Sequence, residues 1–208
     1  MPKGKNKRRS KDGVELTGKC CVISLDQSYT RCGMAIAVNG KLKKVTSIKY
    51  KKVKTKTEKR RMVNSYLTNA INSCLKHYSP DQIIIICERL RLFSQKQIRP
   101  NVIIPSAALI ATIVDTAFDY GIPVFSVDTR AWKSAVLGSS KAIFEPIQGV
   151  ENPQKFGSVR KAITLGFEEQ ITIRNSIGRF KEYDDDAADA ACIALYGFTH
   201  RPMLKKEN

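Results

Sequence analysis

Two apolar runs that each end in an acidic residue constrain the fold of this chain more than any other feature. Residues 20–26 read CCVISLD and residues 83–88 read IIIICE. Continuous apolar runs rich in β-branched residues are typical of strands that are covered on both faces. A carboxylate that leaves such a strand is costly to bury without a partner, because it loses its hydration. Asp26 and Glu88 together therefore predict a shared polar site where neighbouring strands leave the sheet.

The other elements predict an α/β domain with a mixed five-stranded sheet flanked by helices. Asn39-Gly40, within residues 33–53, is a hairpin signal, so three antiparallel strands begin the sheet and parallel strands follow. Apolar residues recur at helical spacing from Val63 to Tyr78. The later elements are a helix over 105–121, a strand over 122–127, a helix over 158–167 and a last helix after the aspartates at 184–186.

The length of 208 residues suits one domain with tails. We expect a basic flexible tail over residues 1–17, a folded domain over 18–199 and a short C-terminal tail over 200–208. The sequence shows no transmembrane run, signal peptide or lipidation motif, so no membrane attachment is expected.

The charge of the chain predicts a polyanionic partner. Lys and Arg number 36 against 19 Asp and Glu, which gives a net charge of +17. Nucleic acid is the leading candidate and an anionic membrane surface the alternative. Residues 41–61 contain Lys or Arg at more than half of their positions and a single Glu. This run suits contact with DNA phosphates, although lysines that protect a sheet edge are the competing interpretation.

The cysteines favour a reducing compartment over a zinc site. All six lie within or beside apolar runs, none forms a C-x-x-C pair, and the chain has only two histidines. Buried, reduced thiols in an intracellular, cytoplasmic protein are the expected result.

The sequence YDDDAADAACIALYGF at residues 183–198 places four aspartates at the start of an apolar helix. Acidic residues at a helix start complement the helix dipole, which explains Asp184 and Asp185. Asp186 and Asp189, three residues apart, share a helix face. Asp185 and Asp189 would share a face as well, so the register of the acidic pair stays open between Asp185 and Asp186.

Carboxylates that gather in one place repel one another unless a cation separates them. Their pKa values would otherwise rise and some of them would bind protons. Mg²⁺ or Mn²⁺, which prefer oxygen ligands, resolve this conflict. Two such ions activate water and stabilise the leaving oxygen in phosphodiester cleavage, so a basic protein with an acidic pocket suits a nuclease.

Three motifs resemble the RuvC-type Holliday junction resolvases of the ribonuclease H-like superfamily. They are LDQSYTRCGMAI at Asp26, IIICERLRLF at Glu88 and DAADAACIAL at Asp186 and Asp189, and the resemblance runs from about Cys20 to Phe198. It implies a ribonuclease H-like fold, a homodimer, and an endonuclease that resolves four-way DNA junctions in recombination and repair. It also implies that these four acids are the catalytic ligands of two Mg²⁺ or Mn²⁺ ions.

The resemblance assigns basic residues as well. Lys133, within AWKSAVLGSSKA, matches a catalytic lysine near the scissile backbone, and Lys141 or Lys155 matches a second. Phe93 stands where the family often has an aromatic wedge, although a core position suits it equally. The first motif has Asp-Gln-Ser where the family often has Asp-Pro-Gly. The expected DNA-binding residues are Arg89, Arg91, Phe93, Lys96, Arg99, Lys141 and Lys155.

Other functions remain alternatives. A ribonuclease H-like nuclease could act on other branched DNA or on RNA–DNA hybrids with the same acids, and a non-catalytic nucleic-acid-binding protein could keep the fold. Actin-like ATPases and sugar kinases share the first strand pattern, but the second half of this chain has no Gly-rich nucleotide loop. A compact resolvase with basic tails suits a bacteriophage or mobile element, acting in the host cytoplasm.

Overall fold

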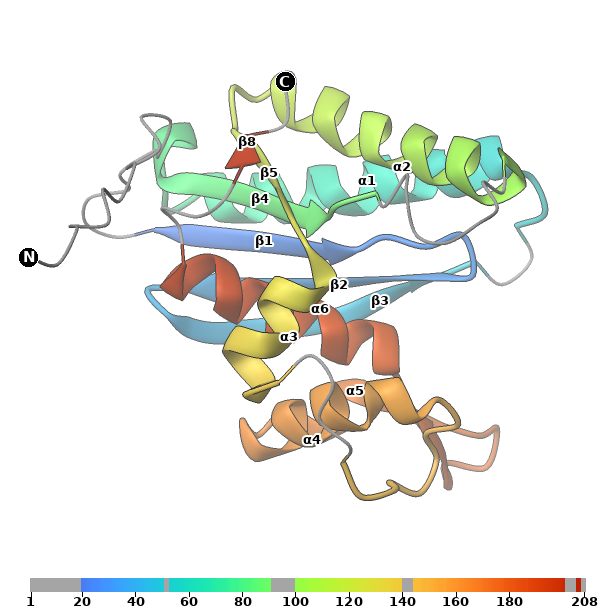
Figure 1. Ribbon diagram of the computed structural model, residues 1–208. Coiled ribbons are helices and arrows are strands. Elements are labelled where there is room, and N and C mark those ends of the chain that lie inside the picture. The colour runs from blue at the N-terminus through green and yellow to red at the C-terminus, as the bar shows by residue number, and fades with distance from the viewer. Residues whose placement is uncertain (1–19, 51–52, 91–99, 140–143, 201–204, 207–208) are drawn as a thin grey trace, which may run out of the picture.

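The computed structural model describes residues 20–50, 53–90, 100–139, 144–200 and 205–206. The predicted N-terminal tail lies outside these ranges. Figure 1 shows a central sheet with helices on both of its faces.

The central sheet has the predicted mixed topology. Its predicted strands are β1 (Cys21–Asp26), β2 (Arg31–Val38), β3 (Lys41–Lys49), β4 (Ile83–Glu88) and β5 (Val124–Val127). They lie in the order β3-β2-β1-β4-β5, with the first three antiparallel and β1, β4 and β5 parallel. A short strand, β8 (Lys205–Lys206), adds to β5 in antiparallel orientation, within the predicted C-terminal tail. The prediction of a five-stranded ribonuclease H-like sheet is confirmed.

The β2–β3 hairpin turns where the sequence predicts it. Asn39 and Gly40 both adopt positive φ, at 50° and 78°. These are the left-handed conformations that a two-residue hairpin loop of this type requires. The turn therefore fixes the register of the β-meander with which the sheet begins.

Helices cover both faces of the sheet. They are α1 (Lys56–Leu75), α2 (Pro100–Phe118), α3 (Thr129–Leu137), α4 (Phe156–Thr164), α5 (Glu168–Ile171) and α6 (Asp185–Thr199), with short 3₁₀ turns η1 (Pro80–Gln82) and η2 (Pro153–Lys155). α1 and α2 lie on one face, α6 lies against the other, and α4 and α5 lie beyond α6 (Figure 1). Among these described helices none is long and apolar enough to cross a membrane.

Two hydrophobic clusters explain why β1 and β4 are apolar on both faces. Ile23 and Ile85 pack into the cluster beneath α1 and α2, whereas Val22 and Ile84 pack into the cluster around α6. All four side chains are buried. Successive side chains of a strand point to opposite faces, so a strand covered on both sides is apolar throughout.

The structure departs from the predicted elements at α2 and α3. α2 begins at Pro100 instead of Pro105, because the helix tolerates Pro105 within it even though that proline has no N–H to donate. No helix was predicted at α3, a short element whose single buried side chain is Trp132. Asp128 caps its start, accepting a hydrogen bond from the Arg130 N–H, and Gly138 ends it with a φ of 83°.

A second, two-stranded sheet was not predicted either. β6 (Thr172–Arg174) and β7 (Phe180–Tyr183) pair in antiparallel orientation and form a hairpin that leads directly into α6. The helix predicted over 158–167 is shifted as well: α4 begins at Phe156 and ends at Thr164, and Gly166 follows with a φ of 83°. The strands are only three and four residues long, which is too short to give a clear alternating pattern.

Small residues let α6 lie directly against the sheet. Ala187, Ala188, Ala190, Ala191 and Ala194 are all fully buried. The Ser24 hydroxyl of β1 donates a 2.6 Å hydrogen bond to the backbone carbonyl of Ala190.

The closest backbone approach is at Gly33 of β2. A Cβ atom there would lie 1.9 Å from the carbonyl oxygen of Asp186 in the first turn of α6. Gly33 pairs with Asp26 across the β1–β2 ladder, so this approach sets the height of the α6 N-terminus above the end of β1.

We predict that Gly33→Ala destabilises the protein by about 1–3 kcal/mol, because the new methyl group meets backbone that must move. Gly197→Ala in the same helix is the matched control. Its Cβ would meet the Cδ1 atom of Ile86, a terminal side-chain atom that can turn aside, and alanine favours the helix by roughly 1 kcal/mol over glycine. Urea denaturation of both variants measures the difference, and an equal loss of stability would contradict this view of the α6 contact.

Candidate active site

The ends of β1 and β4 bring the first two predicted acids to one edge of the sheet. The strands are parallel neighbours, with Leu25 paired to Cys87. Asp26 and Glu88 are the next residues along each strand, so they leave the sheet side by side. The predicted adjacency of the two strands is confirmed.

Gln27 holds these two strand ends together. Its side-chain amide donates a 2.6 Å hydrogen bond to the backbone carbonyl of Glu88 and accepts a 3.1 Å bond from the Glu88 N–H. The amide thereby continues the β1–β4 ladder one step beyond the strand. The Asp-Gln-Ser sequence of this chain thus has a structural role of its own.

Trp132 of α3 orients the Glu88 side chain. The indole N–H donates a 2.6 Å hydrogen bond to Glu88 Oε1, and the ring is fully buried. This contact was not predicted. The only signal in the sequence is that the sole tryptophan stands immediately before Lys133.

Asp184 fixes the start of α6. Its carboxylate accepts a 3.1 Å hydrogen bond from the Ala187 N–H, as an N-cap residue does. The Ser47 hydroxyl of β3 also donates to it, and the Arg31 guanidinium of β2 lies 3.5 Å away. Asp184 is therefore held by the helix it caps and by two strands, which agrees with its predicted role at the helix start.

Three of the predicted acids surround one ammonium group. Lys155, the last residue of η2, lies with its Nζ 2.6 Å from Asp189 Oδ2, 3.2 Å from Asp186 Oδ1 and 3.4 Å from Asp26 Oδ2. Residues from β1, η2 and α6 thus converge on one point. The charge of Lys155 also acts on Asp185, but no hydrogen bond or ion pair joins these two among the described side chains, so the geometry favours Asp186 in the open choice of register.

Burial and mutual repulsion shape the protonation of this cluster. Burial raises the pKa of Asp26 well above its ordinary value, although the charge of Lys155 opposes the rise. Burial also raises the pKa of Asp186 and of Glu88, and in Glu88 the hydrogen bond from Trp132 acts against the increase. Burial lowers the pKa of Lys155, but the three acids outweigh it, so that pKa lies above its ordinary value.

The donor atoms of the cluster suit a hard divalent cation. Asp26, Glu88, Asp186 and Asp189 offer only carboxylate oxygens, which Mg²⁺ and Mn²⁺ prefer. Oδ1 of Asp189 is buried and accepts no hydrogen bond from the described residues. Buried acceptors normally have a partner, so this oxygen is available to a cation. Within the described ranges, no three acidic, histidine or cysteine side chains have the spacing of a bound metal ion, and the acids are instead spaced around Lys155.

The other predicted basic residues are distributed around this cluster. Lys133 donates a 3.2 Å hydrogen bond to the carbonyl of Gln154, beside Lys155, and its Nζ lies 5.3 Å from the centre of the Trp132 ring. Arg89 reaches Ser126 of β5 at 3.4 Å. The remaining candidates lie outside the described residues: Arg91, Phe93, Lys96, Arg99 and Lys141.

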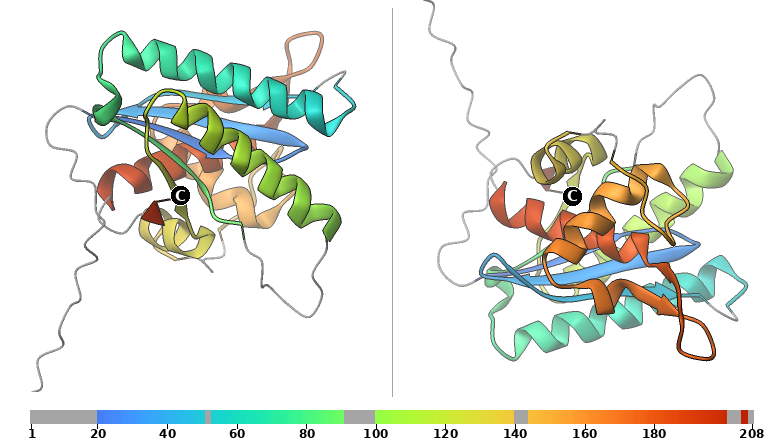
Figure 2. Two further views of the ribbon diagram at one scale, coloured as in Figure 1. Left: turned by 90° about the horizontal axis from the view of Figure 1, so that it is seen from above. Right: turned by 90° about the horizontal axis from the view of Figure 1, so that it is seen from below.

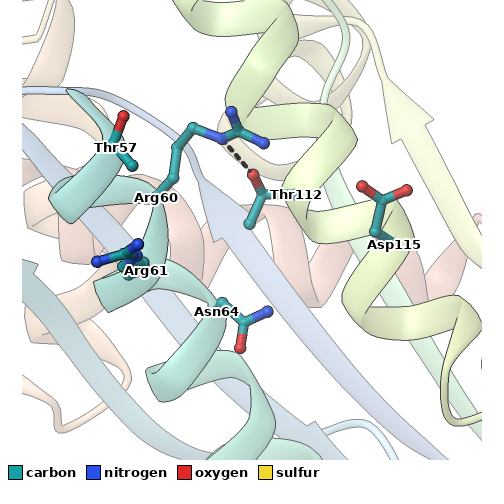
Figure 3. Close-up of a pocket in the computed structure, with 6 residues that line it drawn as sticks. All are labelled: Thr57, Arg60, Arg61, Asn64, Thr112 and Asp115. Carbon is teal, nitrogen blue, oxygen red and sulfur yellow. Dashed lines mark hydrogen bonds between the residues drawn. The ribbon is translucent and has the colours of Figure 1, made fainter.

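A hollow on the face of the sheet that α1 and α2 cover contains none of the predicted catalytic or metal-binding residues. It has a volume of about 530 Å³ and lies between α1 and α2 (Figure 3). Arg60 crosses it to donate a 2.7 Å hydrogen bond to the Thr112 hydroxyl, and Asn64 bonds Thr116 at 3.1 Å. These contacts join the two helices, so we assign this hollow a structural role.

We predict that Lys155→Met destabilises the protein by about 3–5 kcal/mol in EDTA, because it leaves three neighbouring carboxylates without their cation. Lys133→Met is the matched control and should cost about 1 kcal/mol or less. The charge of Lys133 acts on Glu88, but no ion pair or hydrogen bond joins Lys133 to a carboxylate in the described part of the chain. Chemical denaturation of both variants measures their free energies of unfolding, and equal losses of stability would contradict the central position of Lys155.

Comparison with known proteins identifies the fold. No family model matches the sequence. No curated protein matches it either. Among solved structures, RuvC of Thermus thermophilus matches with a TM-score of 0.59 and 17% identity, covering 90% of this chain and 99% of the other. T. thermophilus RuvC in complex with a Holliday junction substrate matches with a TM-score of 0.60 and 18% identity, over the same shares. The chain therefore has a RuvC-like fold.

Proposed function

We propose that this protein is a metal-dependent, structure-specific endodeoxyribonuclease that resolves four-way DNA junctions by paired phosphodiester cleavage. The observation that carries the proposal is the convergence of Asp26, Asp186 and Asp189 on one point, beside Glu88. These positions match the resolvase motifs, and one structure with the same fold is a complex with a Holliday junction.

The four acids would hold Mg²⁺ or Mn²⁺, most simply as a pair of ions. Bound there, the metal would supply an activated water and stabilise charge on the leaving oxygen. Trp132 and Gln27 keep Glu88 in position by bonds to its side chain and backbone. The Lys155 ammonium can pair with a DNA phosphate once it has moved away from the three carboxylates.

The basic surface would collect the DNA around this acidic pocket. Lys41, Lys43, Lys44 and Lys49 are exposed on β3, at the edge of the sheet. Phosphate contacts of this kind position DNA without reading its sequence. Lysines at an edge also discourage strand pairing between molecules, and both roles are compatible at these positions.

We further propose a homodimer formed through α2. Ile104, Ala107, Ala111 and Phe118 are exposed and recur at spacings of three, four and seven residues, which places them along one stripe of the helix together with the exposed Asp115. Ile104 is 67% exposed and Phe118 is 81% exposed. A second copy of the same stripe would bury both side chains, while the alanines allow close approach in a two-fold contact. A two-fold dimer would match the symmetry of paired cuts.

We place the proposed activity in the cytoplasm, in DNA recombination and repair. All six cysteines are buried, and none of them is bonded in a disulfide. The sulfur atoms of Cys21 and Cys74 are only 3.1 Å apart and are not bonded as a disulfide. Free thiols are typical of proteins that work in a reducing compartment.

We predict that the purified protein makes paired, symmetrical nicks in a synthetic four-way junction with Mg²⁺ or Mn²⁺ and none with EDTA. Asp26→Asn, Glu88→Gln, Asp186→Asn and Asp189→Asn should each lower the rate by roughly a hundredfold or more, because a bound metal supplies several kcal/mol of transition-state stabilisation. Junction binding by these variants, measured by gel shift, should persist.

Asp185→Asn is the matched control for Asp186→Asn and should retain cleavage. Intact cleavage in Asp189→Asn would refute the proposed metal ligands. Linear duplex and RNA–DNA hybrid are included as substrates. Preferred cutting of the hybrid would support a ribonuclease instead, and binding without any cutting would support a non-catalytic protein.

We predict that Ala111→Arg converts a dimer into a monomer, because a buried arginine would stand at the centre of the two-fold contact. Ala135→Arg, on the exposed face of α3, is the control and should leave the dimer intact. Sedimentation velocity measures both. A wild-type monomer, or an Ala111→Arg dimer, would argue against α2 as the interface.

A further inference from the structure

The β6–β7 hairpin is a projecting element beside the acidic cluster. It spans residues 172–183 and ends immediately before Asp184, the residue that caps α6. In the right-hand view of Figure 2 its loop stands clear of the rest of the molecule. The sheet that it forms is separate from the central sheet.

The base of the hairpin is firmly attached. Phe180 packs across Gly149, where a Cβ atom would lie 2.6 Å from the phenyl ring, and its ring meets that of Tyr183 edge-on at 4.9 Å. The Tyr183 N–H donates a 3.0 Å bond to the Gly149 carbonyl. The Tyr183 hydroxyl bonds Glu168 at 2.7 Å. These contacts attach the base of the hairpin to the segment at Gly149 and to α5.

The tip is built as a defined turn. The Asn175 side-chain oxygen accepts hydrogen bonds from the backbone N–H groups of Ile177 and Arg179, at 3.1 and 3.0 Å. Gly178 adopts a φ of 80°, and its N–H bonds the Asn175 carbonyl at 3.0 Å. Arg174 bonds both carboxylate oxygens of Glu169 at 2.9 Å. These bonds hold the backbone on either side of Ile177.

The turn presents an apolar side chain between positive charges. Ile177 is 70% exposed at the tip. Within the described part of the chain, no hydrogen bond or ion pair engages the Arg179 guanidinium. The Lys181 side chain is 61% exposed, and its ammonium lies 3.8 Å from Glu182 Oε1. Proteins that enter the DNA minor groove combine such an apolar wedge with flanking arginine or lysine.

The hairpin base borders the proposed catalytic acids. Glu182 and Tyr183 line a pocket of about 410 Å³ together with Lys155, Asp185 and Asp186. Ile177 at the tip is six residues from Tyr183, so it lies at most roughly 20 Å from the hairpin base. That reach corresponds to at most about six nucleotides of duplex, at roughly 3.4 Å per step.

We propose that the β6–β7 hairpin is a second DNA-contacting element, which inserts Ile177 between base pairs of the arm within about six nucleotides of the cleaved phosphate. This inference rests on the proposed function. Arg179 and Lys181 hold the flanking phosphates, and the rigid base transmits the position of the arm to Asp184 and the start of α6. DNA is the partner that matches both the charge of the hairpin and its place beside the acids.

The test uses a four-way junction that carries 2-aminopurine at single positions from two to six nucleotides from the cleavage point. The full-length protein carries Asp26→Asn, so that it binds without cutting. We expect 2-aminopurine fluorescence to rise at one position within this range, because the inserted side chain unstacks the base. Adding Ile177→Ser should abolish that rise and weaken junction binding by roughly tenfold.

Ser176→Ala in the same tip is the matched control and should keep both the signal and the affinity. Because Ile177 is exposed, its replacement should leave the thermal midpoint unchanged. If Ile177→Ser keeps the full fluorescence rise, the hairpin inference is wrong, whatever the protein cleaves. If the Asp26→Asn parent binds a junction no better than a linear duplex while folded, the proposed function fails, and the hairpin inference falls with it.

Discussion

The repulsion among buried carboxylates is the constraint on which this structure depends. Asp26, Asp186 and Asp189 meet at one place, and Glu88 lies beside them. Burial raises the pKa of Asp26, Glu88 and Asp186, so the fold gathers these groups against their own preference. The Lys155 ammonium opposes the repulsion at the centre of the cluster, and the Trp132 indole opposes it at the rim. A divalent cation would oppose the same repulsion with twice the charge of the Lys155 ammonium.

The rest of the fold keeps these groups in register. Parallel pairing of β1 with β4 aligns Asp26 and Glu88, and the Gln27 amide extends that pairing past the strand ends. Gly33 lets the first turn of α6 approach the sheet within backbone contact. The α6 cap is held by two strands at Asp184. A helix that began one residue later would present a different aspartate to Lys155.

Local patterns in the sequence were enough to predict most of the fold. The apolar runs that end at Asp26 and Glu88 correctly predicted neighbouring strands, because a strand covered on both faces is apolar along its whole length. Asn39-Gly40 predicted the hairpin turn for an equally local reason, its need for positive φ. The spacing of Asp186 and Asp189 predicted a shared helix face, and both contact Lys155.

Contacts between distant segments could not be predicted from these patterns. The Trp132 bond to Glu88 spans 44 residues, and no periodicity marks either partner. The choice between Lys141 and Lys155 depends on the path of the segment before α4, which has no regular pattern. The β6–β7 hairpin was missed because its strands are too short to alternate visibly.

The most direct test of the central claim is an anomalous difference map from crystals of the wild-type protein grown with Mn²⁺. The account predicts anomalous density within bonding distance of Asp26, Glu88, Asp186 and Asp189, with the Lys155 ammonium displaced from its present contacts. Density at another place, or a Lys155 ammonium that keeps all three carboxylate contacts while Mn²⁺ supports cleavage, would contradict it.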